Sequence, residues 1–362
     1  MFQNRLNKVK QKLRDEKLDG VLISSISNIA YLTGYSNFFK EERDGYVFIT
    51  KDENYILTHS IYSKSLDGKI PNFKVVEISR REPPEKILQN ILGENSASIG
   101  IEEHDLRVYE YKRLNKVFKN LKNFNLKINR TIKDKDEIEF ITKACQIGDE
   151  VFKKVLKKIK SGISEKQLVF EVDSFIKKED LDISFRTIVA FGANASSPHH
   201  ESGKTKLENN QFVLIDFGVK FENYCSDMTR SVVFGKASQK KKNIYDTVLM
   251  AQQKAVNFVN TTIKKGKQVK AAEVDEVARK YILSQGFPSI PHSLGHGIGL
   301  EVHEHPYLSV KSKEELKEGM VFSIEPGIYI EGFGGVRIED LYVLEKDGLR
   351  QITTSPKKFI QI

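Results

Sequence analysis

Short hydrophobic runs alternate with amphipathic stretches along the first third of the chain. Runs rich in β-branched and aromatic residues predict strands at 20–25, 45–50, 54–59, 73–78 and 97–102. Hydrophobic residues that recur every three or four positions predict helices at 4–18, 83–92 and 108–121. This alternation of strands and helices is typical of an α/β domain, here with a mixed sheet.

A polar stretch at 125–137 predicts the boundary between two domains, at 1–130 and 131–362. Beyond it, two helices followed by a pair of hydrophobic strands occur twice. The helices are predicted at 136–160, 164–178, 243–264 and 272–285, and the strand pairs at 211–221 with 224–235 and 320–330 with 335–345. Asp134 or Asp136 is expected to cap the first helix, and Ser164 with Gln167 the second. The repeat predicts a pseudo-duplicated α+β domain with one antiparallel sheet.

Composition limits the class of protein and its surroundings. The chain of 362 residues is 39% hydrophobic and 30% charged, which fits a soluble globular protein with a sizeable core. No apolar run approaches the roughly 20 residues of a membrane span, and residues 1–20 lack the apolar core of a signal peptide. The only cysteines, Cys145 and Cys225, argue against a disulfide framework and for a reducing compartment, so a cytoplasmic location is expected.

The net charge of +9 comes mainly from lysines that are spread through helical stretches such as 152–160. Lysines in such stretches usually form a solvated face, and the run "QKKKN" at 239–243 is short and has no stacking aromatic residues within it. Charge of one sign alone affects solubility and non-specific binding. A specific nucleic-acid partner is therefore not expected.

Four acidic residues interrupt the predicted strand pairs where hydrophobic residues would be expected. They are Asp216 and Asp227 in the first pair and Glu325 and Glu339 in the second. A carboxylate buried without a partner costs several kcal/mol. Any single one could face solvent from an edge strand, but four in matching places need cations. Carboxylates joined by imidazoles suit hard or borderline divalent ions, among which manganese is more natural than a thiolate-binding metal.

Imidazoles are concentrated in one glycine-rich segment, "PHSLGHGIGLEVHEHP" at 291–306. It holds four of the eight histidines of the chain: His292, His296, His303 and His305. Each glycine costs about 1 kcal/mol in a helix interior, so the segment is not expected to be a helix. The glycines let the backbone lie close to bound metal and substrate.

Five segments together resemble the creatinase/aminopeptidase P/prolidase group of metallopeptidases. They are "VLIDFG", "SDMTRSVVFG", "HSLGHGIGLEVHE", "SIEPGIYI" and "GGVRIED". "YLTGYSNF" and "DEIEFITKACQIGDEVF" are similar to the N-terminal domain and the helix entry of that group, so the resemblance spans nearly the whole chain. It implies a smaller N-terminal α/β domain of the creatinase type, followed by a "pita-bread" catalytic domain. That organisation agrees with the hydrophobic pattern.

The resemblance implies a ligand set for two divalent metal ions: Asp216, Asp227, His296, Glu325 and Glu339. Asp227 and Glu339 match ligands that bridge the ions, Asp216 completes one ion, and the other two residues complete the second. Mn²⁺ is the expected metal, with Co²⁺ and Zn²⁺ as alternatives. Two such ions acidify a shared water for attack on the scissile carbonyl.

Further active-site roles follow from the same resemblance. His303 matches a histidine that stabilises developing charge, and His292 matches a position that lines the pocket beyond the scissile bond. His199, 17 residues before Asp216, matches a further active-site histidine and is preferred over the adjacent His200. Arg337 is expected to steady the bridging ligands, and Thr229 to hold a metal carboxylate. The catalytic residues are thus expected to be His199, His303, Arg337 and Glu325, whereas His59, His104 and His305 receive no role.

The expected activity is removal of an N-terminal residue that precedes proline, from di- or oligopeptides, by a homodimer. The spacing of residues does not separate an Xaa-Pro dipeptidase from an Xaa-Pro aminopeptidase, because it does not show whether the pocket closes around a free carboxylate. A methionine aminopeptidase shares the five ligands but not the N-terminal domain of about 130 residues. Creatinase lacks the metal site. A binding protein of the same fold that has lost catalysis would typically lack one or more ligands.

Overall fold

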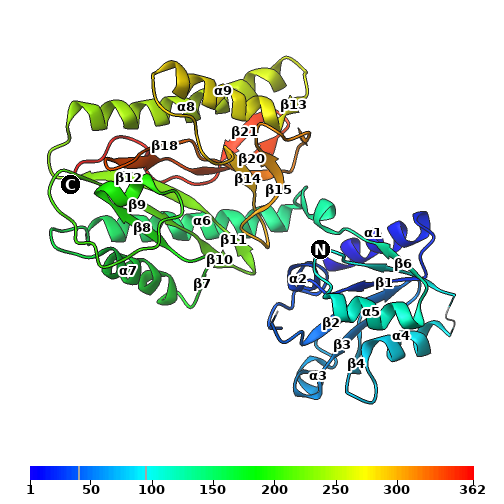
Figure 1. Cartoon of the computed structure of the whole chain (residues 1–362). Coiled ribbons are helices and arrows are strands. Elements are labelled where there is room, and N and C mark those ends of the chain that lie inside the picture. Colours follow the sequence, from blue (N-terminus) through cyan, green and yellow to red (C-terminus); the bar gives the residue numbers. More distant parts are fainter. Residues whose placement is uncertain (40, 94–95) are drawn as a thin grey trace. The chain divides into compact units, whose positions relative to one another are not determined.

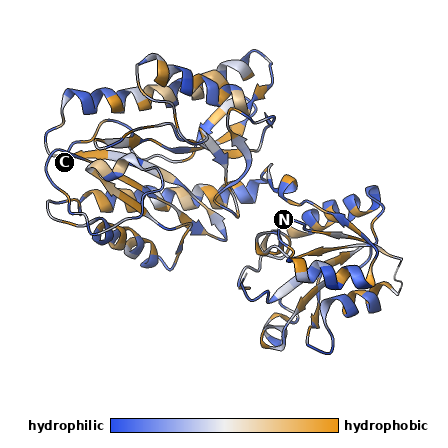
Figure 2. Ribbon diagram, viewed as in Figure 1, coloured by the Kyte–Doolittle hydropathy of each residue, from blue (hydrophilic) through white to orange (hydrophobic). Residues whose placement is uncertain are grey.

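A computed structural model describes residues 1–39, 41–93 and 96–362 (Figure 1). The chain divides into two compact units, Met1–Arg130 and Thr131–Ile362. In both, hydrophobic residues gather on the strands and on the inward faces of the helices (Figure 2). None of the helices in the described parts of the chain is long and apolar enough to cross a membrane.

The first unit contains one six-stranded mixed sheet with the order β4-β3-β2-β1-β5-β6. Its strands are β1 (Gly20–Ile23), β2 (Gly45–Thr50), β3 (Asn54–Thr58), β4 (Lys74–Glu77), β5 (Ser98–Ile101) and β6 (Asn120–Asn123). The neighbours β1–β2 and β2–β3 are antiparallel, and the other pairs are parallel. The mixed sheet predicted from the hydrophobic pattern is therefore present.

The helices of this unit differ in part from the prediction. They are α1 (Phe2–Asp15), α2 (Ile26–Thr33), α3 (Ser60–Leu66), α4 (Pro84–Leu92) and α5 (Val108–Val117), followed by the 3₁₀ turn η1 (Lys127–Arg130). The helix predicted at 108–121 ends at Val117, because residues 120–123 pair with β5 instead. The helix α2 escaped prediction since it is buried from Asn28 to Thr33 and has no polar face.

The second unit contains four long helices. They are α6 (Lys135–Leu156), α7 (Glu165–Lys177), α8 (Gln239–Lys264) and α9 (Ala271–Ser284). At the start of α6 the Asp134 carboxylate accepts from the Glu137 backbone N–H at 3.0 Å, and the Glu137 side chain accepts from the Asp134 N–H. Ser164 and Gln167 form the same reciprocal pair at α7. Both predicted caps are present, with Asp134 as the cap of the first helix.

The strands of the second unit form several small sheets rather than the single antiparallel sheet that was predicted. One half holds β7 (Asp182–Ile183), β8 (Ile188–Phe191), the 3₁₀ turn η2 (Gly192–Ser196), β9 (Gln211–Phe217), β10 (Val219–Phe221), β11 (Tyr224–Cys225) and β12 (Met228–Phe234). The other holds β13 (Val269–Lys270), β14 (Gly295–Gly297), β15 (Glu304–Leu308), β16 (Glu315–Leu316), β17 (Val321–Ile324), β18 (Gly327–Ile330), β19 (Gly334–Arg337), β20 (Asp340–Glu345) and β21 (Gly348–Gln351). The prediction of one sheet was wrong because each strand pair is interrupted near its acidic residues.

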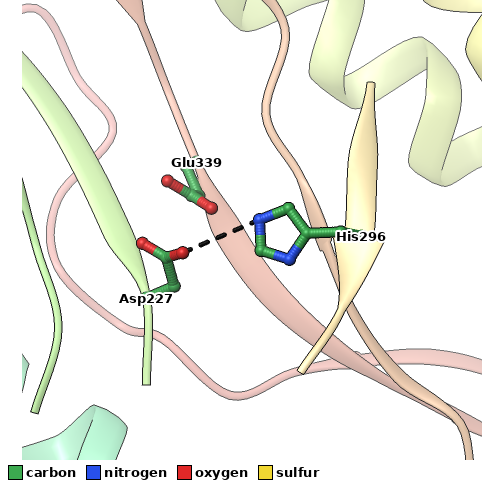
Figure 3. Close-up of side chains that lie close together, drawn as sticks. All are labelled: Asp227, His296 and Glu339. Carbon is green, nitrogen blue, oxygen red and sulfur yellow. Dashed lines mark ion pairs between the residues drawn. The ribbon is translucent and has the colours of Figure 1, made fainter. Parts of the chain in front are cut away.

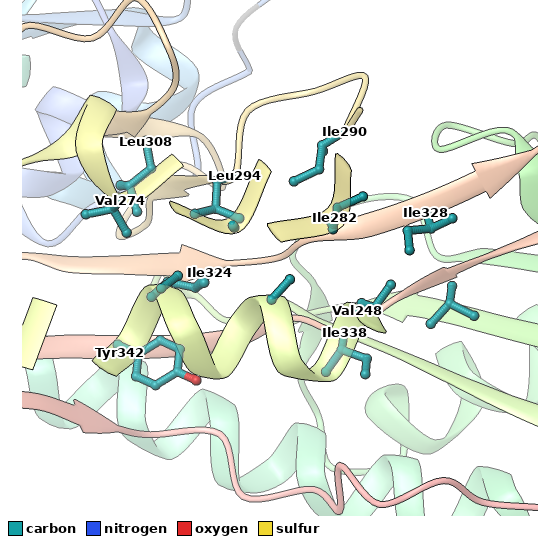
Figure 4. Packing of buried hydrophobic residues seen from close by; sticks show 14 of the residues in the cluster. Val248, Val274, Ile282, Ile290, Leu294, Leu308, Ile324, Ile328, Ile338 and Tyr342 are labelled. Atoms are coloured by element: carbon teal, nitrogen blue, oxygen red, sulfur yellow. The ribbon is translucent and has the colours of Figure 1, made fainter. Parts of the chain in front are cut away.

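Each half has its own sheet and its own pair of helices. The sheet β12-β9-β8 packs against α6 and α7, and the sheet β15-β14-β17-β20-β21 packs against α8 and α9. Figure 4 shows the second core, which includes Val248 of α8, Val274 of α9, and Ile324 and Tyr342 of the sheet region. The duplicated organisation predicted from the repeat is thus present.

The two halves meet along β12 and the β19–β20 segment. The Glu339 backbone N–H donates to the Thr229 carbonyl at 3.1 Å. The Ser231 hydroxyl donates to the Arg337 carbonyl and accepts from the Arg337 N–H, both at 3.1 Å. These contacts bring together the strand breaks of the two halves, where the acidic residues lie.

Candidate metal centre and active site

The four acidic residues occupy corresponding places in the two halves. Asp216 lies near the end of β9 and pairs in register with Thr229 of β12, and Asp227 directly precedes β12. Glu325 directly follows β17, and Glu339 separates β19 from β20. Glu325 is partly buried and the other three acids are buried. A break in a strand turns a side chain out of the regular alternation, so the breaks direct the four carboxylates to one place.

His296 reaches the same place from β14, which is paired with β15 and β17. Its Nε2 lies 3.1 Å from Glu325 Oε1 and 3.7 Å from Asp227 Oδ2. Figure 3 shows Asp227, His296 and Glu339 pointing toward one another from three separate segments. Ligand atoms of these three residues all lie within 4.8 Å of one another. This spacing is small enough for a shared cation.

Burial raises the pKa of three of the four acidic groups. Burial, followed by repulsion from neighbouring carboxylates, raises the pKa of Asp227 and of Glu339 well above their usual ranges. Burial also raises the pKa of Asp216, although Arg337 opposes this shift. Burial disfavours the charged form of Glu325, but the hydrogen bond from His296 and the positive charges of His296, His292 and Arg337 together outweigh burial and lower the pKa of Glu325 to about 2. An added cation would relieve the repulsion.

The unused oxygens of the carboxylates fit a divalent cation. Among the described residues, nothing donates a hydrogen bond to Asp216 Oδ1, Asp227 Oδ1 or Glu339 Oε1, although all three atoms are buried. A buried acceptor without a donor costs free energy, and a bound metal ion would remove that cost. Four carboxylates and one imidazole form an oxygen-rich donor set of the kind that hard or borderline divalent ions prefer.

Arg337 and Thr229 hold the outer oxygens of two of these carboxylates. Arg337 Nη2 donates to Asp216 Oδ2 at 2.5 Å, and its Nε donates to Thr229 Oγ1 at 2.9 Å. The Thr229 hydroxyl in turn donates to Glu339 Oε2 at 2.7 Å. Hydrogen bonds to the outer atoms of metal ligands orient them, and both residues occupy places that suit this task.

Tyr329 completes this network, and sequence reasoning missed it. Its hydroxyl accepts from Arg337 Nη1 at 2.9 Å and lies 2.9 Å from His292 Nε2. Burial raises the pKa of Tyr329 to about 12. It lies on β18 opposite Gly335 of β19. The only available signal was its place four residues after Glu325, which points to the site once the strand pairing is known.

A cavity of about 340 Å³ opens onto the acidic cluster. The five predicted ligands contribute to its wall together with His199, His292, His303 and Arg337. The ring of His303 stands perpendicular to that of His296, with centroids 4.3 Å apart. Burial lowers the pKa of His292 and of His303, which favours their neutral forms at pH 7.

Two other histidines of the sequence lie outside the wall of this cavity. His305 Nδ1 is 2.9 Å from Glu314 Oε1, with a side chain 39% exposed. His200 Nε2 is 2.9 Å from Glu165 Oε2, although its neighbour His199 lines the cavity. Sequence reasoning also missed the hydrophobic part of the wall, which comes from Phe185, Ile188, Val302 and Tyr307.

Comparison with known proteins agrees with these features. Residues 139–346 match metallopeptidase family M24, and residues 5–131 match the creatinase/prolidase N-terminal domain. The chain is 33% identical to an Xaa-Pro dipeptidase of Pyrococcus furiosus, over 99% of this chain and 100% of that protein. The predicted resemblance and the predicted fold class are therefore confirmed.

Solved structures resemble the chain over its whole length. The Xaa-Pro dipeptidase from Bacillus anthracis has a TM-score of 0.90 at 30% identity and covers 100% of both chains. The X-Pro aminopeptidase from Thermotoga maritima MSB8 has a TM-score of 0.88 at 30% identity and covers 99% of both chains. With its acidic cluster, its histidine-lined cavity and these likenesses, the chain belongs to metallopeptidase family M24 as a peptidase with a creatinase/prolidase N-terminal domain.

Proposed function

We propose that this peptidase cleaves the bond between an N-terminal residue and proline with the help of two divalent metal ions. The observation that supports the proposal most directly is that four acidic side chains from matching strand breaks and His296 of β14 meet at one cavity. In this assignment Asp216, Asp227, His296, Glu325 and Glu339 would together hold the ions. The relatives named as Xaa-Pro dipeptidases support the choice of proline.

The metal ions, when bound, would act as Lewis acids toward the scissile carbonyl and toward a water molecule. Glu325 takes up the proton that the water loses and returns it to the leaving proline nitrogen. His303 and His199 stabilise the charge that develops on the scissile amide. Arg337 keeps Asp216 and Thr229 in place, and His292 lines the pocket beyond the scissile bond.

The pocket also suits the proline residue itself. Proline has no backbone N–H, so the wall beside it needs no acceptor. The hydrophobic side chains of Phe185, Ile188 and Val302 line the cavity and suit a pyrrolidine ring. A substrate with an N–H at this position would leave a buried donor unsatisfied.

The wall of the cavity favours a second candidate, an Xaa-Pro aminopeptidase that acts on longer peptides. A dipeptide carries a free carboxylate on its proline, and a pocket that selects dipeptides needs a cation for it. Among the described residues that line the cavity, Arg337 is the only lysine or arginine, and its guanidinium already binds Asp216, Thr229 and Tyr329. The relatives named as Xaa-Pro dipeptidases favour an enzyme that acts on dipeptides, so a comparison of dipeptide and tripeptide substrates must decide.

Other features of the proposal rest on the sequence. Mn²⁺ is the expected metal, with Co²⁺ and Zn²⁺ as alternatives. The two free, buried cysteines support a reducing, cytoplasmic location. The homodimer remains a prediction that light scattering can test.

A methionine aminopeptidase activity and a catalytically silent binding role are the alternatives that activity measurements must exclude.

The first prediction concerns substrate choice. Chelated protein reloaded with Mn²⁺ is given an Xaa-Pro dipeptide, an Xaa-Pro-Yaa tripeptide and a Met-Ala-Ser peptide, and released amino acids are quantified. We expect hydrolysis only at bonds before proline and only with metal. Cleavage of the dipeptide alone identifies a dipeptidase, and cleavage of the tripeptide identifies an aminopeptidase. Release of methionine alone contradicts the proline assignment, and no hydrolysis with any divalent metal contradicts the enzymatic proposal.

A further inference from the structure

A second buried carboxylate lies outside the acidic cluster, at the start of α7. Glu165 is fully buried. Its Oε1 accepts from the Phe191 N–H at 2.9 Å and from Asn194 Nδ2 at 2.8 Å. Its Oε2 accepts from the Gly203 N–H at 2.8 Å and lies 2.9 Å from His200 Nε2. All four partners belong to one segment, 191–203, which joins β8 to the chain before β9.

This segment carries His199 to the cavity. Pro198 and His199 line the cavity wall, whereas His200 turns away from it toward Glu165. Because carboxylate oxygens only accept, His200 donates through Nε2 in this pair. The two adjacent histidines therefore have different surroundings: His199 lines the cavity, and His200 binds the buried Glu165 carboxylate.

The opposite side of the segment packs against the hairpin that carries Arg337 and Tyr329. An added Cβ at Gly335 would lie only 2.2 Å from the Ala195 carbonyl oxygen, and one at Gly334 would lie 2.7 Å from that of Gly192. The Pro198 carbonyl also accepts from Arg337 Nη1 at 3.4 Å. The segment is thus held between Glu165 on one side and β19 on the other.

The Glu165 carboxylate has no neutral substitute in this place. Hydrogen bonds to an ionised acceptor are roughly twice as strong as neutral ones. A glutamine at this position keeps one acceptor oxygen. Its NH₂ group is a donor and would face two of the N–H groups that now donate to the carboxylate, so those hydrogen bonds would be lost. Loss of the carboxylate therefore releases one end of the segment while β19 still holds the other.

We propose that Glu165 is a positioning residue that fixes segment 191–203, through His200 and three other donors, so that His199 points into the cavity. This inference rests on the proposed function, because it assigns His199 a task in catalysis. It predicts that Glu165 affects the reaction through His199 and leaves the metal ligands undisturbed.

The test is a double-mutant cycle with Glu165→Gln and His199→Ala, measured with Mn²⁺ as kcat on the Xaa-Pro dipeptide or Xaa-Pro-Yaa tripeptide that the wild-type protein hydrolyses. Glu165→Gln should lower kcat about tenfold to a hundredfold in the wild-type background. In the His199→Ala background the same change should cost less than about twofold, because residues that act as a unit are not additive. Equal losses in both backgrounds, or no loss, would overturn the inference.

Two further variants, His200→Ala and His200→Gln, test the same contact from the other side if Glu165→Gln folds poorly. His200→Ala should also lower kcat, and His200→Gln should restore part of it, because the glutamine amide can donate to Glu165. The control is Glu201→Gln, whose side chain is 75% exposed and pairs with Arg186 at the surface, and it should leave kcat unchanged. An equal kcat for His200→Ala and wild type would contradict the inference.

A readout without catalysis separates this inference from the proposed function. Hydrogen exchange should accelerate in 191–203 of the Glu165→Gln variant, while exchange in α8 and the number of metal ions bound per chain stay as in wild type. If wild-type protein hydrolyses no peptide, the proposed function fails and the exchange result still decides whether Glu165 fixes the segment. Unchanged exchange in 191–203 would overturn the inference by itself.

Discussion

Arg337 shows at the residue scale how the proposed metal ligands are held. Its guanidinium donates to three side chains at once, those of Asp216, Thr229 and Tyr329, and also to the Pro198 carbonyl. A planar group with five donors in fixed directions can satisfy all three, whereas the lysine ammonium is a single compact charge. The positive charge alone therefore does not explain an arginine at this position.

We expect Arg337→Lys to lower metal affinity about tenfold to a hundredfold, as loss of an orienting partner typically does. The lysine can approach Asp216 but cannot also bind Thr229, so Glu339 loses its ordered neighbour. Metal titration of the chelated protein, followed by calorimetry, measures the change. Thr229→Val offers a milder comparison, since it removes the hydrogen bond to Glu339 and keeps the arginine. An unchanged affinity in Arg337→Lys would show that charge alone suffices.

At the scale of the element, β14 explains why its histidine lies between glycines. The strand passes so close to its neighbours that a Cβ at Gly295 would lie 2.0 Å from the Ser323 carbonyl oxygen. At Gly297 a Cβ would lie 2.1 Å from the His305 carbonyl oxygen. Both obstacles are backbone atoms, which cannot move aside as a side chain can. The glycines thus allow β14 to bring His296 up to the acids.

Gly297→Ala should destabilise the fold and weaken metal binding, because β14 must shift and carry His296 with it. The matched control is Gly148→Ala in α6, where the nearest atoms lie 3.9 Å from the added Cβ. That substitution should stabilise the protein by about 0.5–1 kcal/mol, because alanine is the better residue in a helix. Thermal unfolding and metal content measure both variants. A Gly297→Ala protein that melts and binds metal like wild type would refute this account of β14.

At the scale of the whole molecule, the proposed metal site joins the two halves of the second unit. The proposed ligands Asp216 and Asp227 come from the first half, and His296, Glu325 and Glu339 come from the other. Without a cation, mutual repulsion of the buried acids opposes the junction of β12 with the β19–β20 segment. Metal binding is therefore expected to stabilise the second unit as a whole.

Metal at a hundredfold excess over its dissociation constant should stabilise this unit by about 2.7 kcal/mol. Hydrogen exchange with and without chelator locates the effect. We expect faster exchange in β9, β12, β17 and β20 after chelation, and no change in β1–β3 of the first unit, which contributes no ligand among the described residues. Equal acceleration in both units would mean that the metal acts elsewhere.

Features that depend on neighbouring positions could be read from the sequence alone. The periodicity of α8, a cap at Asp134 or Asp136 and the acids that interrupt the strand pairs are all local patterns that predicted the organisation of the second unit, and the resemblance of five short motifs indicated the family. The candidate ligands were found for the same reason, because a carboxylate is conspicuous in a hydrophobic run.

Only the tertiary structure decided which distant groups meet. The segment 120–123 forms β6 because β5 offers a partner, although the helix predicted at 108–121 included its first two residues. Tyr329 reaches Arg337 because β18 and β19 pair, and His200 meets the buried Glu165, which lies 35 residues earlier in the chain. Such pairings depend on groups far apart in the chain, and local hydrophobic patterns carry no information about them.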